Sequence, residues 1–95
     1  MSLEALTTKY ISMAEAVLKK LVRIKTPILL NERNVAEVLD WANRYLEDAK
    51  YYKAQGNLET SLTSVAYCEG LLDALRLLGA VNFEWPTKPE NQKLS

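Results

Sequence analysis

The feature that most constrains the fold is the pair Gly56-Asn57, which lies between two long segments of helical periodicity. Glycine adopts the left-handed backbone that ends many helices, and asparagine is a favoured first cap of the next one. Because so short a connection leaves no room for a crossover, the two helices must run antiparallel. The sequence therefore predicts a helical hairpin built from residues 32–55 and 58–78.

A third amphipathic segment precedes this hairpin, over residues 2–25. Its apolar residues recur at steps of three and four, which places them on one stripe of a helix. The members of this stripe are Leu3, Leu6, Tyr10, Met13, Val17, Leu21 and Ile24. Thr26-Pro27 is expected to stop the helix, because the residue before a proline avoids helical backbone. The predicted fold class is all-α, an up-and-down three-helix bundle with an extended C-terminal tail.

The tail changes character after the third helix. Three apolar residues alternate there with polar ones: Val81, Phe83 and Trp85. A period of two suits an extended segment, and we expect it to dock across Trp41 and Tyr52, on its own chain or on a partner. Residues 86–95 are polar and are predicted to be disordered, which leaves one three-helix domain over residues 1–85.

Charge and cysteine content narrow the partners and the compartment. Twelve basic residues balance twelve acidic ones, so the chain has no long-range attraction for nucleic acid or for an anionic membrane. No apolar stretch approaches the roughly 20 residues of a membrane span. The single cysteine, Cys68, suits a reducing compartment. We therefore expect a cytoplasmic protein with no nucleic-acid and no membrane partner.

The sequence contains no recognisable catalytic set. It has no histidine, the usual general base near neutral pH and the commonest metal ligand. Cys68 falls on the apolar seam of the third helix, where a buried structural cysteine is the expected role. Glycine-rich phosphate loops and zinc-ligand spacings are missing from the sequence. We predict a protein that is not an enzyme and that uses no cofactor.

Three carboxylates border the predicted core and form a candidate polar cluster: Asp48 on the second helix, and Glu69 and Asp73 on the third. In one interpretation they are oxygen ligands of a cation or an acid pair. In the other they accept hydrogen bonds from tyrosine hydroxyls and pair with Arg44 or Arg76. We favour the structural interpretation, and both stay open from the sequence.

The third helix has apolar or small residues on more than one side. A ridge of small residues, Ala66, Gly70 and Ala74, repeats at four-residue spacing. Mid-helix glycine is less favourable than alanine by about 1 kcal/mol, so we expect another helix, from the same chain or a second copy, to approach closely there. Exposed aromatic residues likewise mark interfaces. The candidate interface residues are Trp41, Tyr67, Gly70, Leu71, Ala74, Leu78, Phe83 and Trp85.

Four short elements of the hairpin form a distinctive pattern: Tyr45-Leu46-Glu47-Asp48-Ala49, Tyr51-Tyr52, Gly56-Asn57 and Tyr67-Cys68-Glu69-Gly70-Leu71-Leu72-Asp73-Ala74-Leu75. This pattern resembles a family of small archaeal helical proteins of unknown function. The resemblance is good over the second and third helices and loose over the first. It implies an archaeal source and a three-helix bundle of the immunoglobulin- and albumin-binding-domain shape. A shared shape transfers no binding activity.

The hairpin is also faintly similar to helical domains that accompany minimal nucleotidyltransferases in prokaryotes. Some of those are ribonucleases that need an arginine and a nearby histidine, and this chain has no histidine. Two functional hypotheses follow. The first is a non-catalytic protein-interaction or oligomerisation module, whose partner is another protein or a second copy in a homodimer. The alternative is a small-molecule or cation-binding accessory domain that acts beside a nucleotide-using enzyme.

Overall fold

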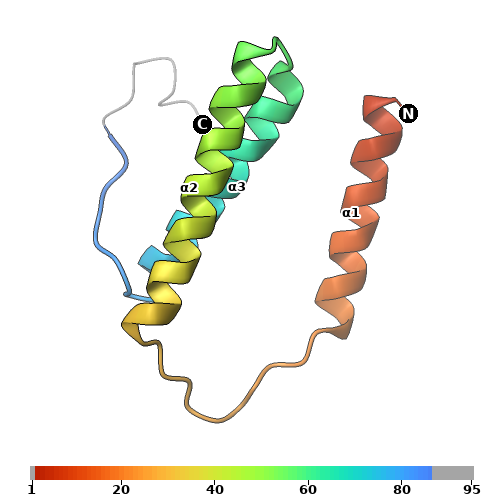
Figure 1. Ribbon diagram of the computed structural model, residues 1–95. Helices are drawn as coiled ribbons and strands as arrows, with labels where there is room; N and C mark the ends of the chain where they lie inside the picture. The colour runs from red at the N-terminus through yellow and green to blue at the C-terminus, as the bar shows by residue number, and fades with distance from the viewer. Residues whose placement is uncertain (1, 87–95) are drawn as a thin grey trace.

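The computed structural model describes residues 2–86 and contains three helices (Figure 1). Helix α1 spans Leu3–Lys20, α2 spans Glu32–Ala54 and α3 spans Leu58–Leu77. No strand occurs among these residues, so the predicted all-α class with three helices is confirmed. The prediction of disorder for residues 86–95 falls, apart from Pro86, outside the described residues.

Each helix begins at a side-chain cap that satisfies its first free amides. The Ser2 hydroxyl accepts a hydrogen bond from the backbone N–H of Ala5 at 3.0 Å. Asn31 caps α2 in a reciprocal pair with Asn34, in which each side-chain oxygen accepts from the other residue's backbone N–H. Asn57 caps α3 by accepting from the N–H of Thr60 at 3.2 Å. Polar caps therefore fix the start of all three helices.

The predicted hairpin is present. Gly56 has φ +79°, and the N–H of Asn57 donates to the carbonyl of Tyr52, which closes α2 with the usual left-handed glycine motif. The antiparallel helices α2 and α3 then pack along their lengths. Most of the residues buried between the two helices have small side chains. The buried residues are Ala42 and Ala49 of α2 and Ser64, Cys68 and Leu75 of α3.

Helix α1 does not pack on this hairpin. Among residues 2–86, contacts between helices occur only for α2 with α3, and α1 stands apart beside them (Figure 1). The up-and-down order of the three helices is as predicted, but the expected packing of the first helix is not observed. The radius of gyration is 16.2 Å, whereas a compact chain of this length has about 12 Å. The chain is therefore open rather than closed into one bundle.

The first helix also ends earlier than predicted, at Lys20 instead of residue 25. Leu21 already has extended backbone, with ψ 147°. Two β-branched residues follow, Val22 and Ile24, and these lose rotamer freedom in a helix. Continuing the helix would also place Lys19 and Arg23 one turn apart, where like charges repel. These local preferences therefore end the helix upstream of Thr26-Pro27, where the proline was expected to stop it.

Candidate functional site

An aromatic ladder crosses from α2 to α3 on one face of the hairpin. Trp41 lies beside Tyr45 with ring centroids 6.2 Å apart, and Tyr45 stacks on Tyr67 of α3 at 5.0 Å. Trp41 is 46% exposed and Tyr67 is 57% exposed. On α3, Leu71 and Leu78 continue this stripe at helical spacing from Tyr67. We call these five residues the aromatic face.

Charged side chains border the aromatic face on α2. The Arg44 guanidinium lies 4.9 Å from the centre of the Trp41 ring, in a cation–π contact. Its Nη2 also lies 2.8 Å from a carboxylate oxygen of Asp40. Both charged side chains are more than half exposed, so this pair stabilises α2 by only a few tenths of a kcal/mol. Its clearer effect is to hold a cation over the exposed tryptophan.

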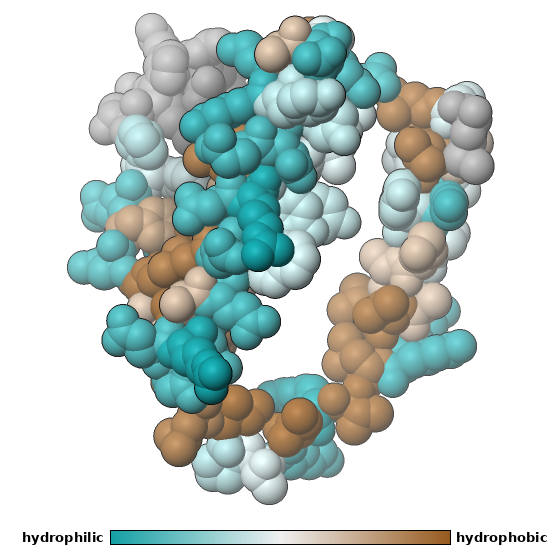
Figure 2. Space-filling view, viewed as in Figure 1, coloured by the Kyte–Doolittle hydropathy of each residue, from teal (hydrophilic) through white to brown (hydrophobic). Residues whose placement is uncertain are grey.

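The apolar stripe of α1 lies in solvent. Four of its members, Leu3, Tyr10, Met13 and Val17, are between 51% and 62% exposed. Figure 2 shows hydrophobic atoms gathered on the lower part of α1 and an open space between this helix and the hairpin. The stripe predicted from the sequence is therefore real as a helical face, but its expected partner surface does not cover it.

The connection between α1 and α2, residues 21–31, is also apolar and exposed. Six of its eleven residues are large hydrophobic side chains: Leu21, Val22, Ile24, Ile28, Leu29 and Leu30. Their exposed fractions run from 46% to 90%. This segment extends between α1 and α2 (Figure 1). Loops on a protein surface are usually polar. We therefore expect another surface to cover the hydrophobic side chains of this connection.

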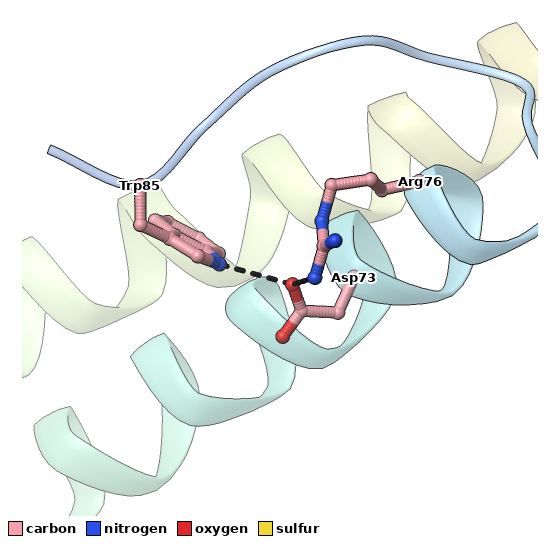
Figure 3. A network of polar contacts seen from close by, with 3 residues as sticks. All are labelled: Asp73, Arg76 and Trp85. Atoms are coloured by element: carbon pink, nitrogen blue, oxygen red, sulfur yellow. Dashed lines mark hydrogen bonds and ion pairs between the residues drawn. The ribbon is translucent and has the colours of Figure 1, made fainter. Parts of the chain in front are cut away.

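The tail lies on a different side of the hairpin. The indole N–H of Trp85 donates to a carboxylate oxygen of Asp73 at 3.0 Å, and Arg76 donates to the same oxygen at 3.0 Å (Figure 3). Phe83 packs edge-on against Trp85, with Arg76 over its ring. The hydrogen bonds from Trp85 and Arg76 lower the pKa of Asp73 below its usual value. We call this arrangement the tail latch.

The tail latch corrects one expectation from the sequence. The tail was expected to dock across Trp41 and Tyr52, whereas its polar and ring contacts are with α3 at Asp73 and Arg76. Asp73 follows Tyr67 by six positions, which is about 120° around a helix. The aromatic face and the tail latch are therefore on different sides, and Figure 1 shows the tail and α1 flanking the hairpin on opposite sides.

The candidate interface residues divide between these two sides. Trp41, Tyr67, Leu71 and Leu78 belong to the aromatic face, and Phe83 and Trp85 belong to the tail latch. Gly70 and Ala74 are exposed beside the aromatic face. A Cβ added at Gly70 would meet nothing within 4 Å, so no helix among residues 2–86 approaches this ridge, and close approach by a second copy stays a prediction.

The three carboxylates of the candidate polar cluster are not gathered. Asp73 is held in the tail latch, paired with Arg76 as the structural interpretation proposed but bonded to a tryptophan rather than a tyrosine. Asp48 lines an open depression of about 410 Å³ on α2 that neither of the other two reaches. Glu69 is exposed on α3. Within residues 2–86, no group of three potential metal-ligating side chains is close enough to hold an ion.

Comparison with known protein families adds one finding. The family described as "Protein of unknown function (DUF357)" matches residues 9–81, well over half of the chain. The chain belongs to the DUF357 family. This confirms the resemblance to a family of unknown function, and the match reaches back into α1, where the resemblance was loose. Comparisons with curated proteins and with solved structures give no match.

The DUF357 match begins within α1 and ends just beyond α3, so the family pattern includes both the hairpin and the helix that stands apart from it. None of the three helices described for this DUF357 chain is long and apolar enough to cross a membrane.

Two features of the site were missed from the sequence. The first is the Trp85–Asp73 hydrogen bond, which depends on how the tail turns after Gly79. The second is the hydroxyl of Ser61, which donates to the carbonyl of Ala49 at 2.7 Å and links α3 to α2. The polar position of Ser61 on an apolar seam was the available signal, because a buried hydroxyl needs a partner.

Proposed function

We propose that this chain is a non-catalytic association module in which α1 is the binding element. The observation that carries the proposal is the exposed apolar stripe of α1, which no other described residue covers. Burying one large aliphatic or aromatic side chain contributes about 1.5–3 kcal/mol. Several such side chains lie in water on α1, so docking of this helix on a surface that buries them is strongly favourable.

The exposed area of the chain supports this proposal. Its accessible surface is 8633 Å², whereas a folded monomer of 10.8 kDa exposes roughly 5500 Å². We set aside about 1500 Å² for residues 87–95, which the structure does not describe, at the value that a fully exposed segment of their mass would have. An excess of roughly 1600 Å² per chain is what a permanent protein–protein interface buries.

The non-catalytic part of the proposal rests on Cys68 and on the absence of histidine. Cys68 is 6% exposed, and burial together with the nearby Glu69 raises the pKa of its thiol. The thiolate, which is the nucleophilic form, is therefore disfavoured. The sequence offers no histidine as its base. The alternative, a small-molecule or cation-binding accessory domain, receives no support from Asp48, Glu69 and Asp73, which lie in separate surroundings.

The experiment that tests association is light scattering on the full chain across a wide range of protein concentration. We expect the mass of an oligomer at high micromolar concentration and a melting temperature that rises with concentration. Val17→Asp, on the stripe, should shift the chain toward monomer. Ser12→Asp adds the same charge about 140° around the helix and should leave the mass unchanged. A single-chain mass at every concentration would refute the proposal.

A further inference from the structure

We infer that two copies of this chain exchange their first helices, so that α1 of each copy docks on the aromatic face of the other. This inference rests on the proposed association function and names its partner, a second copy of the same chain. The occupant is argued from four observations: matching dimensions, opposite charge, an apolar connection and the area left exposed.

The dimensions of the two surfaces match. Helix α1 has 18 residues and is about 27 Å long, and α3, with 20 residues, is about 30 Å long. The aromatic face runs from Tyr67 on α3 to Leu78, the C-cap of α3, and includes Trp41 and Tyr45 on α2. A third amphipathic helix laid along two antiparallel helices completes the smallest helical core. The chain therefore contains both parts of such a core, α1 and the α2–α3 hairpin, but they do not contact each other.

The charges of the two parts are opposite. Residues 2–31 contain five basic and two acidic side chains, whereas residues 32–77 contain five basic and eight acidic ones. The first segment thus carries a net charge of +3 and the hairpin a net charge of −3. Opposite net charges attract the arm of one copy to the hairpin of another, while the neutral whole chain has little self-repulsion.

The connection between α1 and α2 favours a second copy over the chain's own hairpin. Its eleven residues can span about 36 Å when extended. Thr26-Pro27 biases its middle toward extended backbone and against a tight reversal. When two arms cross between copies, their exposed apolar connections meet near the two-fold axis. The large hydrophobic side chains of the two connections then cover one another. This explains why residues 21–31 are apolar although they form a loop.

A reciprocal exchange also closes. Each copy gives one helix and receives one, so the assembly has two-fold symmetry and leaves no surface for a third copy. It buries the stripe, the aromatic face and the connections in a single step. The roughly 1600 Å² that each chain exposes in excess is of the size that a permanent dimer buries from each partner.

Isotope mixing tests the exchange directly. Light and ¹⁵N-labelled full-length chains are unfolded together, refolded, and treated with a short amine-reactive cross-linker. Antiparallel docking of α1 on α2 brings Lys9 toward Lys50 and Lys53, near the end of α2. We expect a dimeric mass, and half of the Lys9–Lys50 and Lys9–Lys53 links should join a light chain to a heavy one. Links between Lys50 and Lys53 lie within one helix and should stay unmixed, which provides the internal control.

The outcomes separate this inference from the association proposal. A dimer whose Lys9 links all stay within chains of one isotope overturns the exchange, because α1 then covers its own hairpin, while association itself stands. A single-chain mass overturns both.

A matched pair of variants then tests the receiving surface. Tyr67→Ser removes the exposed end of the aromatic ladder and should weaken the dimer by about tenfold or more. Tyr51→Ser removes an equally exposed tyrosine, 59% against 57%, that lies about 120° around α2 from Tyr45. It should leave the dimer unchanged. Equal weakening by both variants, or by neither, would show that α1 docks elsewhere.

Discussion

Helix α1 and the two helices of the hairpin have similar lengths, 18, 23 and 20 residues, and each begins at a well-formed cap. They differ in what their apolar residues touch. The hairpin buries its innermost residues against itself, because a short connection holds its two helices in register. Helix α1 is joined by eleven residues and leaves its stripe in water. The comparison teaches that local signals specify a helix, whereas the connection decides whether its apolar face is satisfied within the chain.

The largest expected effect is a loss of stability in the hairpin, the part that buries its own apolar residues. Leu75 is 3% exposed and is the largest of the buried residues between α2 and α3, whereas Leu77 on the same helix is 79% exposed. Leu75→Ala should lower the free energy of unfolding by about 2–4 kcal/mol, because it leaves a cavity in a narrow core. Leu77→Ala should change it by no more than about 0.5 kcal/mol. Urea unfolding followed by circular dichroism measures both, and a similar loss from the two variants would mean that Leu77 is also covered.

The same contrast explains how much the sequence could predict. The cap Asn57, the left-handed Gly56, and the bounds of α2 and α3 to within one residue all follow from side-chain chemistry within a few positions. These features depend on neighbours that the sequence itself places together. Local rules therefore predicted the hairpin well.

Features that depend on distant groups were predicted less well. Whether α1 packs on the hairpin depends on the balance between closing an eleven-residue connection and meeting another chain, and periodicity does not record that balance. The predicted docking of the tail was wrong for a similar reason, since Trp85 and Phe83 contact Asp73 and Arg76, which are distant in sequence. Glu69 and Asp73 share a face of α3 in helical projection and Asp48 borders the core of α2, but projection fixes only direction around an axis and not distance between helices.

The second prediction concerns the turn that makes the hairpin self-contained. Gly56 has φ +79°, a conformation that is unfavourable for residues with a Cβ. Gly56→Ala should therefore destabilise the hairpin by about 1 kcal/mol, measured by urea unfolding. Gly56→Asn should lose less, because asparagine tolerates left-handed backbone better than alanine. If alanine and asparagine were equally harmful, strain of the left-handed backbone would not explain the loss, and neither would crowding, because a Cβ added at Gly56 meets nothing within 4 Å.

The third prediction tests whether any helix packs against the small-residue ridge of α3. Gly70 has helical backbone, and a Cβ added there meets nothing within 4 Å. Gly70→Ala should therefore raise the free energy of unfolding by about 0.5–1 kcal/mol, through helix propensity alone. Light scattering on the same variant should give the native mass. A loss of stability or of the oligomer would instead reveal a helix packed against this ridge.

The smallest expected effect concerns the tail latch, on the side of the hairpin away from α1. Hydrogen bonds from Trp85 and Arg76 to Asp73 lower the pKa of this carboxyl in the folded chain. A lowered pKa means that the latch contributes stability above the ordinary value of about 3.9 and loses it as the pH falls through the folded value. With Trp41→Phe as background, the fluorescence of Trp85 should therefore stay constant near neutral pH and shift to longer wavelength only below about pH 4.

Two substitutions at Asp73 separate charge from hydrogen bonding in the latch. Asp73→Asn keeps an oxygen acceptor for the indole N–H and should remove the acid transition while retaining much of the native emission. Asp73→Leu removes the acceptor and should give red-shifted emission at every pH. Neither variant should alter the oligomeric mass, because the latch and the aromatic face lie about 120° apart on α3. A change of mass in Asp73→Leu would instead place the tail, and not α1, at the surface between copies.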